Sequence, residues 1–219
     1  MRRFKYLRVR VPQAVIRNHA KNHEIYSDHG LSIVRSNSRE ISLEFTSTRN
    51  LSAVQILADG SIVRTDVPTM ERYFARLRVS GGNGFLVLEG APRGTRIQDD
   101  ILKILCRDDD YYFEPLQITS QMIFEHVANF DLYNLVTAKV RDLRLSNSVV
   151  CRIEVSSKEG VGDELNRLVE GRFHRLDSMT FEITHQFQRG LITYSSGGAL
   201  RVADSLADCA LSFFEDALI

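Results

Sequence analysis

Residues 52–65 read SAVQILADGSIVRT, two short apolar runs on either side of Asp59-Gly60. An Asp-Gly pair between runs rich in Val and Ile is typical of a tight turn that joins two antiparallel strands. The sequence therefore predicts a β-hairpin here, with strands over residues 52–57 and 61–65.

The stretch that follows this hairpin fits two interpretations. Pro68 suits the first turn of a helix. The apolar residues after it lie at helical spacing: Met70, Tyr73, Phe74 and Leu77. A strand is the alternative, because a second set alternates with polar residues: Tyr73, Ala75, Leu77 and Val79. We favour a helix over residues 68–78 and keep the strand as the open alternative.

Two pairs of passages repeat along the chain. Residues 35–48, RSNSREISLEFTST, match residues 145–158, LSNSVVCRIEVSSK, 110 positions later. Residues 9–22 match residues 116–129 at an offset of 107, and His19 falls on His126. Each copy reads as a strand end, a helix and then an antiparallel hairpin with a polar Asn-containing turn. An internal duplication accounts for this order, and chance similarity in composition is the alternative.

These patterns together predict an α+β fold. We expect two similar pseudo-repeats of antiparallel hairpins interleaved with helices, packed as one compact unit. The expected halves are residues 1–107 and residues 108–219. Besides residues 68–78, helices are expected over residues 13–22, 95–105, 119–129, 162–170 and 202–217.

Length and composition exclude several classes of protein. The chain has 219 residues, of which 43% are hydrophobic and 26% charged, and this composition excludes a disordered chain. No apolar run is long enough to cross a membrane as a helix, and the early charges in MRRFKYLRVRVP do not suit a signal peptide. The three Cys residues form no close pair, which argues against a disulfide framework. We therefore expect a cytoplasmic protein.

Charge is distributed unevenly along the chain. The whole sequence has 28 basic and 28 acidic residues, but residues 1–105 carry 17 basic and 10 acidic ones. Fourteen of those 17 are Arg, whose planar guanidinium matches phosphate and carboxylate groups. A basic first half and an acidic second half suggest either a polyanionic partner or docking between oppositely charged protein surfaces.

An Arg-rich surface is the leading candidate for a binding site. The strand expected near the N-terminus alternates Arg with apolar residues, and an Arg/aromatic face of this kind can bind phosphates and stack bases. The candidate nucleic-acid-binding residues are Arg2, Arg3, Lys5, Arg8, Arg10, Arg72, Arg76 and Arg78. The first functional hypothesis is thus a non-catalytic binding subunit that presents Arg side chains to nucleic acid or another polyanion.

Two other hypotheses remain open. The first is a protein-interaction subunit of a larger heteromeric or homo-oligomeric assembly, which uses the charge asymmetry to dock. The second is a metal-independent ribonuclease, with His19, His23 and His29 as weak candidates for a general base. No Gly-rich loop has a phosphate-binding spacing, so we expect no cofactor, and no group of His and Cys residues predicts a metal site.

Overall fold

The computed structural model describes residues 1–10, 29–37, 40–80, 83–90, 112–146 and 148–218, which form two compact units. The C-terminal unit contains Met1–Arg8 together with Phe113–Ile219, and the central unit contains Val9–Tyr112. Strands account for 60% and helices for 17% of the structure. The α+β prediction with interleaved helices, packed as one unit, is therefore wrong: the fold is mainly antiparallel β.

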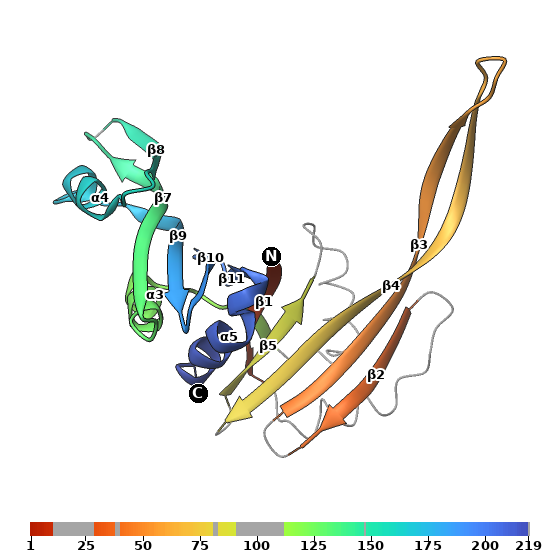
Figure 1. Ribbon diagram of the computed structural model, residues 1–219, viewed down its shortest axis with the longest axis horizontal. Coiled ribbons are helices and arrows are strands. Elements are labelled where there is room, and N and C mark those ends of the chain that lie inside the picture. The colour runs from red at the N-terminus through yellow and green to blue at the C-terminus, as the bar shows by residue number, and fades with distance from the viewer. Residues whose placement is uncertain (11–28, 38–39, 81–82, 91–111, 147, 219) are drawn as a thin grey trace. The chain divides into compact units, whose positions relative to one another are not determined.

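The central unit is a run of four antiparallel strands in the order β2-β3-β4-β5. Their bounds are β2 His29–Ser36, β3 Glu40–Ile56, β4 Ile62–Ser80 and β5 Asn83–Glu89. Figure 1 shows that β3 and β4 continue together well past the ends of β2 and β5.

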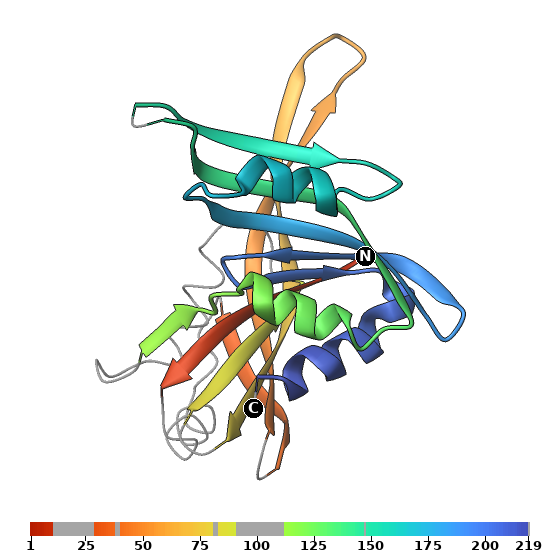
Figure 2. The ribbon, with the colours of Figure 1, turned by 90° about the vertical axis from the view of Figure 1, so that its left-hand side faces the viewer.

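In the C-terminal unit, six of the described strands follow the order β1-β11-β10-β9-β7-β8, and a seventh, β6, pairs with β1. Its strands are β1 Arg2–Arg10, β6 Tyr112–Pro115, β7 Leu132–Arg144, β8 Val150–Ser156, β9 Arg175–His185, β10 Gln188–Ser195 and β11 Ala199–Val202. Its helices are α3 Ser120–Val127, α4 Gly162–Val169, the short 3-10 helix η1 Asp204–Leu206 and α5 Ala207–Asp216. Figure 2 shows α3 (green) and α5 (dark blue) side by side in this unit, where His126 of α3 contacts Phe214 of α5.

In the sheet of the central unit, buried apolar side chains alternate with side chains on the opposite face. Ile41, Leu43 and Phe45 on β3 are buried, while the residues between them point to the other face. Leu43 lies opposite Ala75 on β4, which is also buried. A strand with one apolar face buries every second residue in this way.

The helix predicted over residues 68–78 is wrong, because this stretch belongs to β4. Tyr73, Ala75 and Leu77 are buried and the residues between them are outward, which is the strand alternative. Pairing with β3 on one side and β5 on the other outweighs the local helical spacing. Pro68 lies opposite Asn50, in a part of β4 that β5 does not reach, and such an edge tolerates proline.

The two repeated hairpins both form, but they are not equivalent. In β2–β3 the first strand lies at the edge and the second is internal, while in β7–β8 the second strand is the edge. Leu43 is fully buried for that reason, whereas its predicted counterpart Ile153 on β8 is half-exposed. The prediction of two similar pseudo-repeats is therefore wrong. The helices predicted over residues 13–22 and 95–105 lie outside the described residues.

Helix prediction succeeded in the C-terminal unit. Helix α3 lies within the expected residues 119–129, and Thr119 caps it by accepting a hydrogen bond from the Met122 amide. Helix α4 matches the expected residues 162–170. Helix α5 begins later than the expected residue 202, because Val202 ends strand β11 and Asp204–Leu206 form η1. In the part of the chain that the structure describes, no helix is long and apolar enough to span a membrane.

Candidate functional site

The basic residues predicted near the N-terminus lie on β1, and two of them are engaged within the C-terminal unit. Arg2 forms an ion pair with Asp208 at 3.2 Å. The Lys5 ammonium donates a hydrogen bond to the Gly197 carbonyl, and partial burial lowers the pKa of this amine. Both side chains are therefore engaged in contacts within the same chain.

The remaining basic residues of β1 differ in exposure and in their neighbours. Arg8 is exposed and its guanidinium lies 3.9 Å from the Glu114 carboxylate. Arg3 is half-exposed, and the side chain of Arg10 is outside the described residues. Alternation along β1 would place the aromatic Tyr6 on the same face as Arg8 and Arg10, but Tyr6 is fully buried. The Arg/aromatic face expected on this strand is therefore absent as far as its described side chains show.

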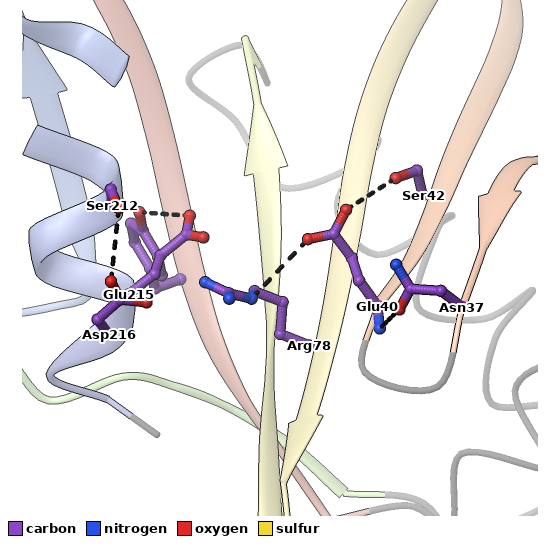
Figure 3. Close-up of polar contacts among 8 residues, drawn as sticks. Asn37, Glu40, Ser42, Arg78, Ser212, Glu215 and Asp216 are labelled. Carbon is purple, nitrogen blue, oxygen red and sulfur yellow. Dashed lines mark hydrogen bonds and ion pairs between the residues drawn. The ribbon is translucent and has the colours of Figure 1, made fainter. Parts of the chain in front are cut away.

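The predicted Arg residues of β4 lie on the outward face of the central unit, among acidic neighbours. Arg72 is 3.5 Å from Glu44, and Arg78 is 3.8 Å from Glu40. Figure 3 shows Arg78 directed at Glu40, which also accepts a hydrogen bond from Ser42. Arg72 and Arg78 on β4 thus each lie near a carboxylate of β3.

The histidine candidates do not form a described catalytic group. His19 and His23 lie outside the described residues, and His29 begins β2 with a side chain that is not described. No group of His, Cys, Asp or Glu among the described residues has the arrangement of a metal site.

His126 has a structural role in the C-terminal unit. It is 1% exposed, and its Nε2 lies 2.9 Å from the Ala210 carbonyl oxygen while its Nδ1 lies 2.6 Å from the Tyr194 hydroxyl. The carbonyl only accepts, so Nε2 carries the proton and the Tyr194 hydroxyl donates to Nδ1. Burial lowers the pKa of His126 to about 4, which keeps the ring neutral. His126 is therefore a buried, hydrogen-bonded residue of the core, and His19, on which it falls in the repeat, lies outside the described residues.

Tyr6 is a second buried polar contact in this unit. Its hydroxyl donates to the Glu215 carboxylate at 3.2 Å, and its ring packs edge-on against Phe214. Figure 3 shows Glu215 on α5, beside Ser212 and Asp216. This contact helps to attach α5 to the strands, because a buried carboxylate requires a donor.

A cavity of about 450 Å³ lies beneath α4. Phe124, Leu165 and Phe181 form part of its apolar wall, with Asn134 and His174 among the polar residues that line it. Apolar side chains make up most of its lining.

The most unusual feature is the projecting end of the β3–β4 hairpin. We call residues 48–56 and 62–70 with their connecting turn the arm. The two strands stay paired throughout, from Thr48 opposite Met70 to Ile56 opposite Ile62. Ile56 is 72% exposed and Ile62 is 63% exposed. The other exposed large apolar residues of the arm are Leu51, Val54, Leu57, Val63, Val67 and Met70.

Both faces of the arm are apolar. Alternation puts Val54 and Ile56 on one face, and Leu51 and Val67 on the other. The second face continues the line of Phe45, which is buried in the sheet. The core-facing side of the hairpin thus extends beyond the core that covers it.

The turn at the end of the arm is well defined. The Gly60 amide donates to the Leu57 carbonyl and the Leu57 amide to the Ser61 carbonyl, both at 2.9 Å. Gly60 has a φ of 82°, a left-handed conformation that glycine adopts without strain. The Asp59 side chain accepts from Ser61, and these hydrogen bonds lower the pKa of its carboxyl group. The hairpin predicted from Asp59-Gly60 is confirmed.

Both edges of the arm are open in the described part of the chain. The pairing of β2 with β3 ends at Ser47, and that of β5 with β4 begins at Phe74. An isolated two-stranded hairpin is marginally stable in water. In the described part of the chain, the arm therefore combines unpaired strand edges with exposed apolar side chains on both faces.

The sequence predicted the hairpin at Asp59-Gly60 but not its extension as the arm. Each expected strand was short, and a helix over residues 68–78 would have ended the hairpin early. One signal was present: Val54 and Ile56 point to one face while Leu51 and Leu57 point to the other, so neither face is polar. A strand that is apolar on both faces is either buried or bound.

Comparison with known proteins adds no relative. No known protein family matches this chain, and no curated protein matches it.

Proposed function

We propose that this chain is a non-catalytic protein-interaction subunit that docks through the arm. The observation that carries the proposal is the exposure of large apolar side chains on both faces of a paired hairpin with two open edges. Monomeric proteins rarely leave such continuous apolar surface in water. Burying one Val, Leu or Ile side chain fully contributes about 1.5–3 kcal/mol, so a few of these residues supply useful binding energy.

The charge of the arm supports a protein partner rather than a polyanion. Residues 48–70 contain two basic residues, Arg49 and Arg64, and two acidic ones, Asp59 and Asp66. A surface with balanced charge has no net attraction for phosphate groups. The free thiols of Cys151 and Cys209 support a reducing, cytoplasmic setting for this subunit.

The test removes the arm and keeps the sheet. Residues 50–68 are replaced by Asn-Gly, so that a two-residue turn joins the paired positions Arg49 and Thr69. Wild type and variant are isolated from the native organism with the same tag and sized by light scattering after gel filtration. The wild type is expected as an assembly of defined stoichiometry and the armless protein as a folded monomer.

Two observations decide this test. Near-ultraviolet circular dichroism of the variant must match that of the wild type, which shows that the rest of the chain is folded. An armless protein that keeps the same assembly contradicts the proposal.

Binding of a polyanion is the second candidate function. The exposed Arg35 and Arg72 support it, because both lie on the outward face of the central unit. Titration with single- and double-stranded nucleic acids is expected to show affinity that falls steeply between roughly 50 and 200 mM salt if phosphates are bound. No binding at the lower salt concentration removes this candidate.

A further inference from the structure

We propose that the partner of the arm is a second copy of this chain, and that the two copies pair along the β4 edge around a twofold axis at Thr65. This inference rests on the proposed function. Two features support it. One is which residues of β4 direct their main-chain amide and carbonyl groups to the open edge, and the other is the position of the charged residues along β4.

The turn sets which main-chain groups of β4 are free. The Leu57 amide bonds to the Ser61 carbonyl, and hydrogen-bonded pairs recur at every second position of an antiparallel ladder. Val63 and Thr65 therefore direct their amide and carbonyl groups toward β3. Arg64 and Asp66 direct theirs to the open edge, where a further strand can pair.

The sequence of this edge is complementary to itself. Residues 63–67 read VRTDV. Twofold antiparallel pairing centred on Thr65 sets Arg64 of each copy opposite Asp66 of the other, and Val63 opposite Val67. Opposite charges at directly facing positions stabilise a strand pair, whereas like charges destabilise it. The same residues Arg64 and Asp66 also exchange the main-chain hydrogen bonds in this register.

The existing contacts leave both charges available. Asp66 accepts a hydrogen bond from the Ser52 hydroxyl at 2.6 Å on one carboxylate oxygen. The second oxygen can receive a guanidinium group. In the part of the chain that the structure describes, Arg64 has no acidic partner, and its side chain is exposed.

Pro68 limits the length of the pairing. In this register Ile62 faces Pro68 of the second copy. The Pro68 carbonyl can accept a hydrogen bond from the Ile62 amide, but proline has no amide proton to donate to the Ile62 carbonyl. The intermolecular ladder thus ends after residues 62–68. A twofold contact uses the same edge on both copies, so the assembly closes as a dimer rather than growing into a fibre.

The β3 edge of the arm lacks this complementarity. Its outward positions are Asn50, Ser52, Val54 and Ile56. A twofold axis at Ala53 sets Ser52 opposite Val54 and Asn50 opposite Ile56, which places polar side chains against apolar ones. Pairing along β4 instead produces a four-stranded sheet with apolar side chains on each face, and three or more strands are enough for an independently stable sheet.

The experiment reverses the charges one at a time and then together. Arg64→Glu opposes two carboxylates across the axis, and Asp66→Arg opposes two guanidinium groups. Each single variant is expected to weaken dimerisation at least about tenfold in sedimentation velocity, because like charges face each other at two symmetry-related positions. The double variant Arg64→Glu/Asp66→Arg restores both ion pairs and is expected to dimerise like the wild type.

Mixing the two single variants supplies a sharper measurement. A heterodimer of Arg64→Glu and Asp66→Arg pairs Glu with Arg at one position and Asp with Arg at the other. Each variant alone is therefore monomeric while the mixture forms a dimer. Arg35→Glu makes the same charge change on β2, outside the arm, and is expected to leave the dimer intact.

The outcomes separate this inference from the function on which it rests. A wild-type assembly that contains other chains but one copy of this protein overturns the dimer and leaves the arm as an interaction segment. A dimer that needs the arm but ignores the charge reversals overturns the β4 register alone. A wild type that is monomeric both in isolation and in the native organism overturns both proposals.

Discussion

Strands β3 and β4 pass through two environments along one continuous ladder. Where β2 and β5 flank them, Leu43 and Leu77 are fully buried. Beyond the ends of these flanking strands, Leu51 on the same β3 strand is 49% exposed and Ile56 is 72% exposed. The backbone pairing is alike in both parts, so backbone hydrogen bonds alone do not account for the difference in burial.

The comparison separates two roles that apolar residues have in a strand. In the flanked part they form a core and specify the register, since a slip by one residue would expose them. In the arm the same alternation has no core to face within the described structure. In the proposed dimer these apolar residues supply binding energy, and the unpaired strand edges determine how the two copies pair.

The largest expected effect comes from truncating one leucine in each environment. Leu43→Ala is expected to lower the free energy of unfolding by about 2–5 kcal/mol, because it leaves a cavity in the core. Leu51→Ala on the same strand is expected to change it by less than about 0.5 kcal/mol in the isolated monomer. Urea unfolding followed by circular dichroism measures both, and equal losses in the two variants would show that the arm is packed like the sheet.

Acid is expected to lower the free energy of unfolding by a smaller amount, and the group responsible is His126 in the C-terminal unit. His126 has a pKa of about 4 in the folded protein against 6.5 as its ordinary value, so between these pH values the unfolded chain binds a proton that the folded chain does not. Its contribution is complete above pH 6.5 and is lost as pH falls toward 4, by about 3 kcal/mol in total. Residues 48–70 contain no His, so arm-mediated pairing lacks this dependence.

The test compares how steeply the free energy of unfolding changes with pH in two proteins. Urea unfolding is measured over the same pH range for wild type and for His126→Gln, which does not titrate. The variant should show a flatter dependence of stability on pH. Parallel curves for the two proteins would mean that His126 is not the group responsible.

The smallest expected effect concerns the ion pairs on the outward face of the flanked region. Arg72 lies 3.5 Å from Glu44 and its side chain is 65% exposed. An exposed pair of this kind contributes about 0.2–1 kcal/mol, so Arg72→Ala should barely change the unfolding midpoint in urea. A loss as large as that of Leu43→Ala would show that charge, rather than apolar burial, holds the flanked part together.

Local patterns predicted much of the secondary structure because their causes are local. The Asp59-Gly60 turn and the Thr119 cap of α3 depend on hydrogen bonds to residues within four positions. The error at residues 68–78 has the opposite cause. Tyr73 and Leu77 satisfy helical and strand spacing equally, and only pairing with β3 and β5 distinguishes the two.

The candidate site was predictable only in its parts. The sequence shows where the Arg residues are, but the neighbouring carboxylates of Glu44 and Glu114 come from other strands, so the sequence does not reveal these ion pairs. The arm depends on where β2 and β5 stop. That end point is a property of strand pairing between distant segments rather than of residues 48–70 themselves.

By itself the sequence determined the turn at residues 57–61, the helices α3 and α4, and the alternating faces of β3, since these follow from backbone preference and periodicity. Tertiary structure alone decided which strands lie at an edge. It made β2 and β8 edges, so that two locally similar hairpins became different, and it left the arm beyond its neighbours. The physical reason is that burial and edge pairing are satisfied between segments, and a local pattern records that a face is apolar without recording what covers it.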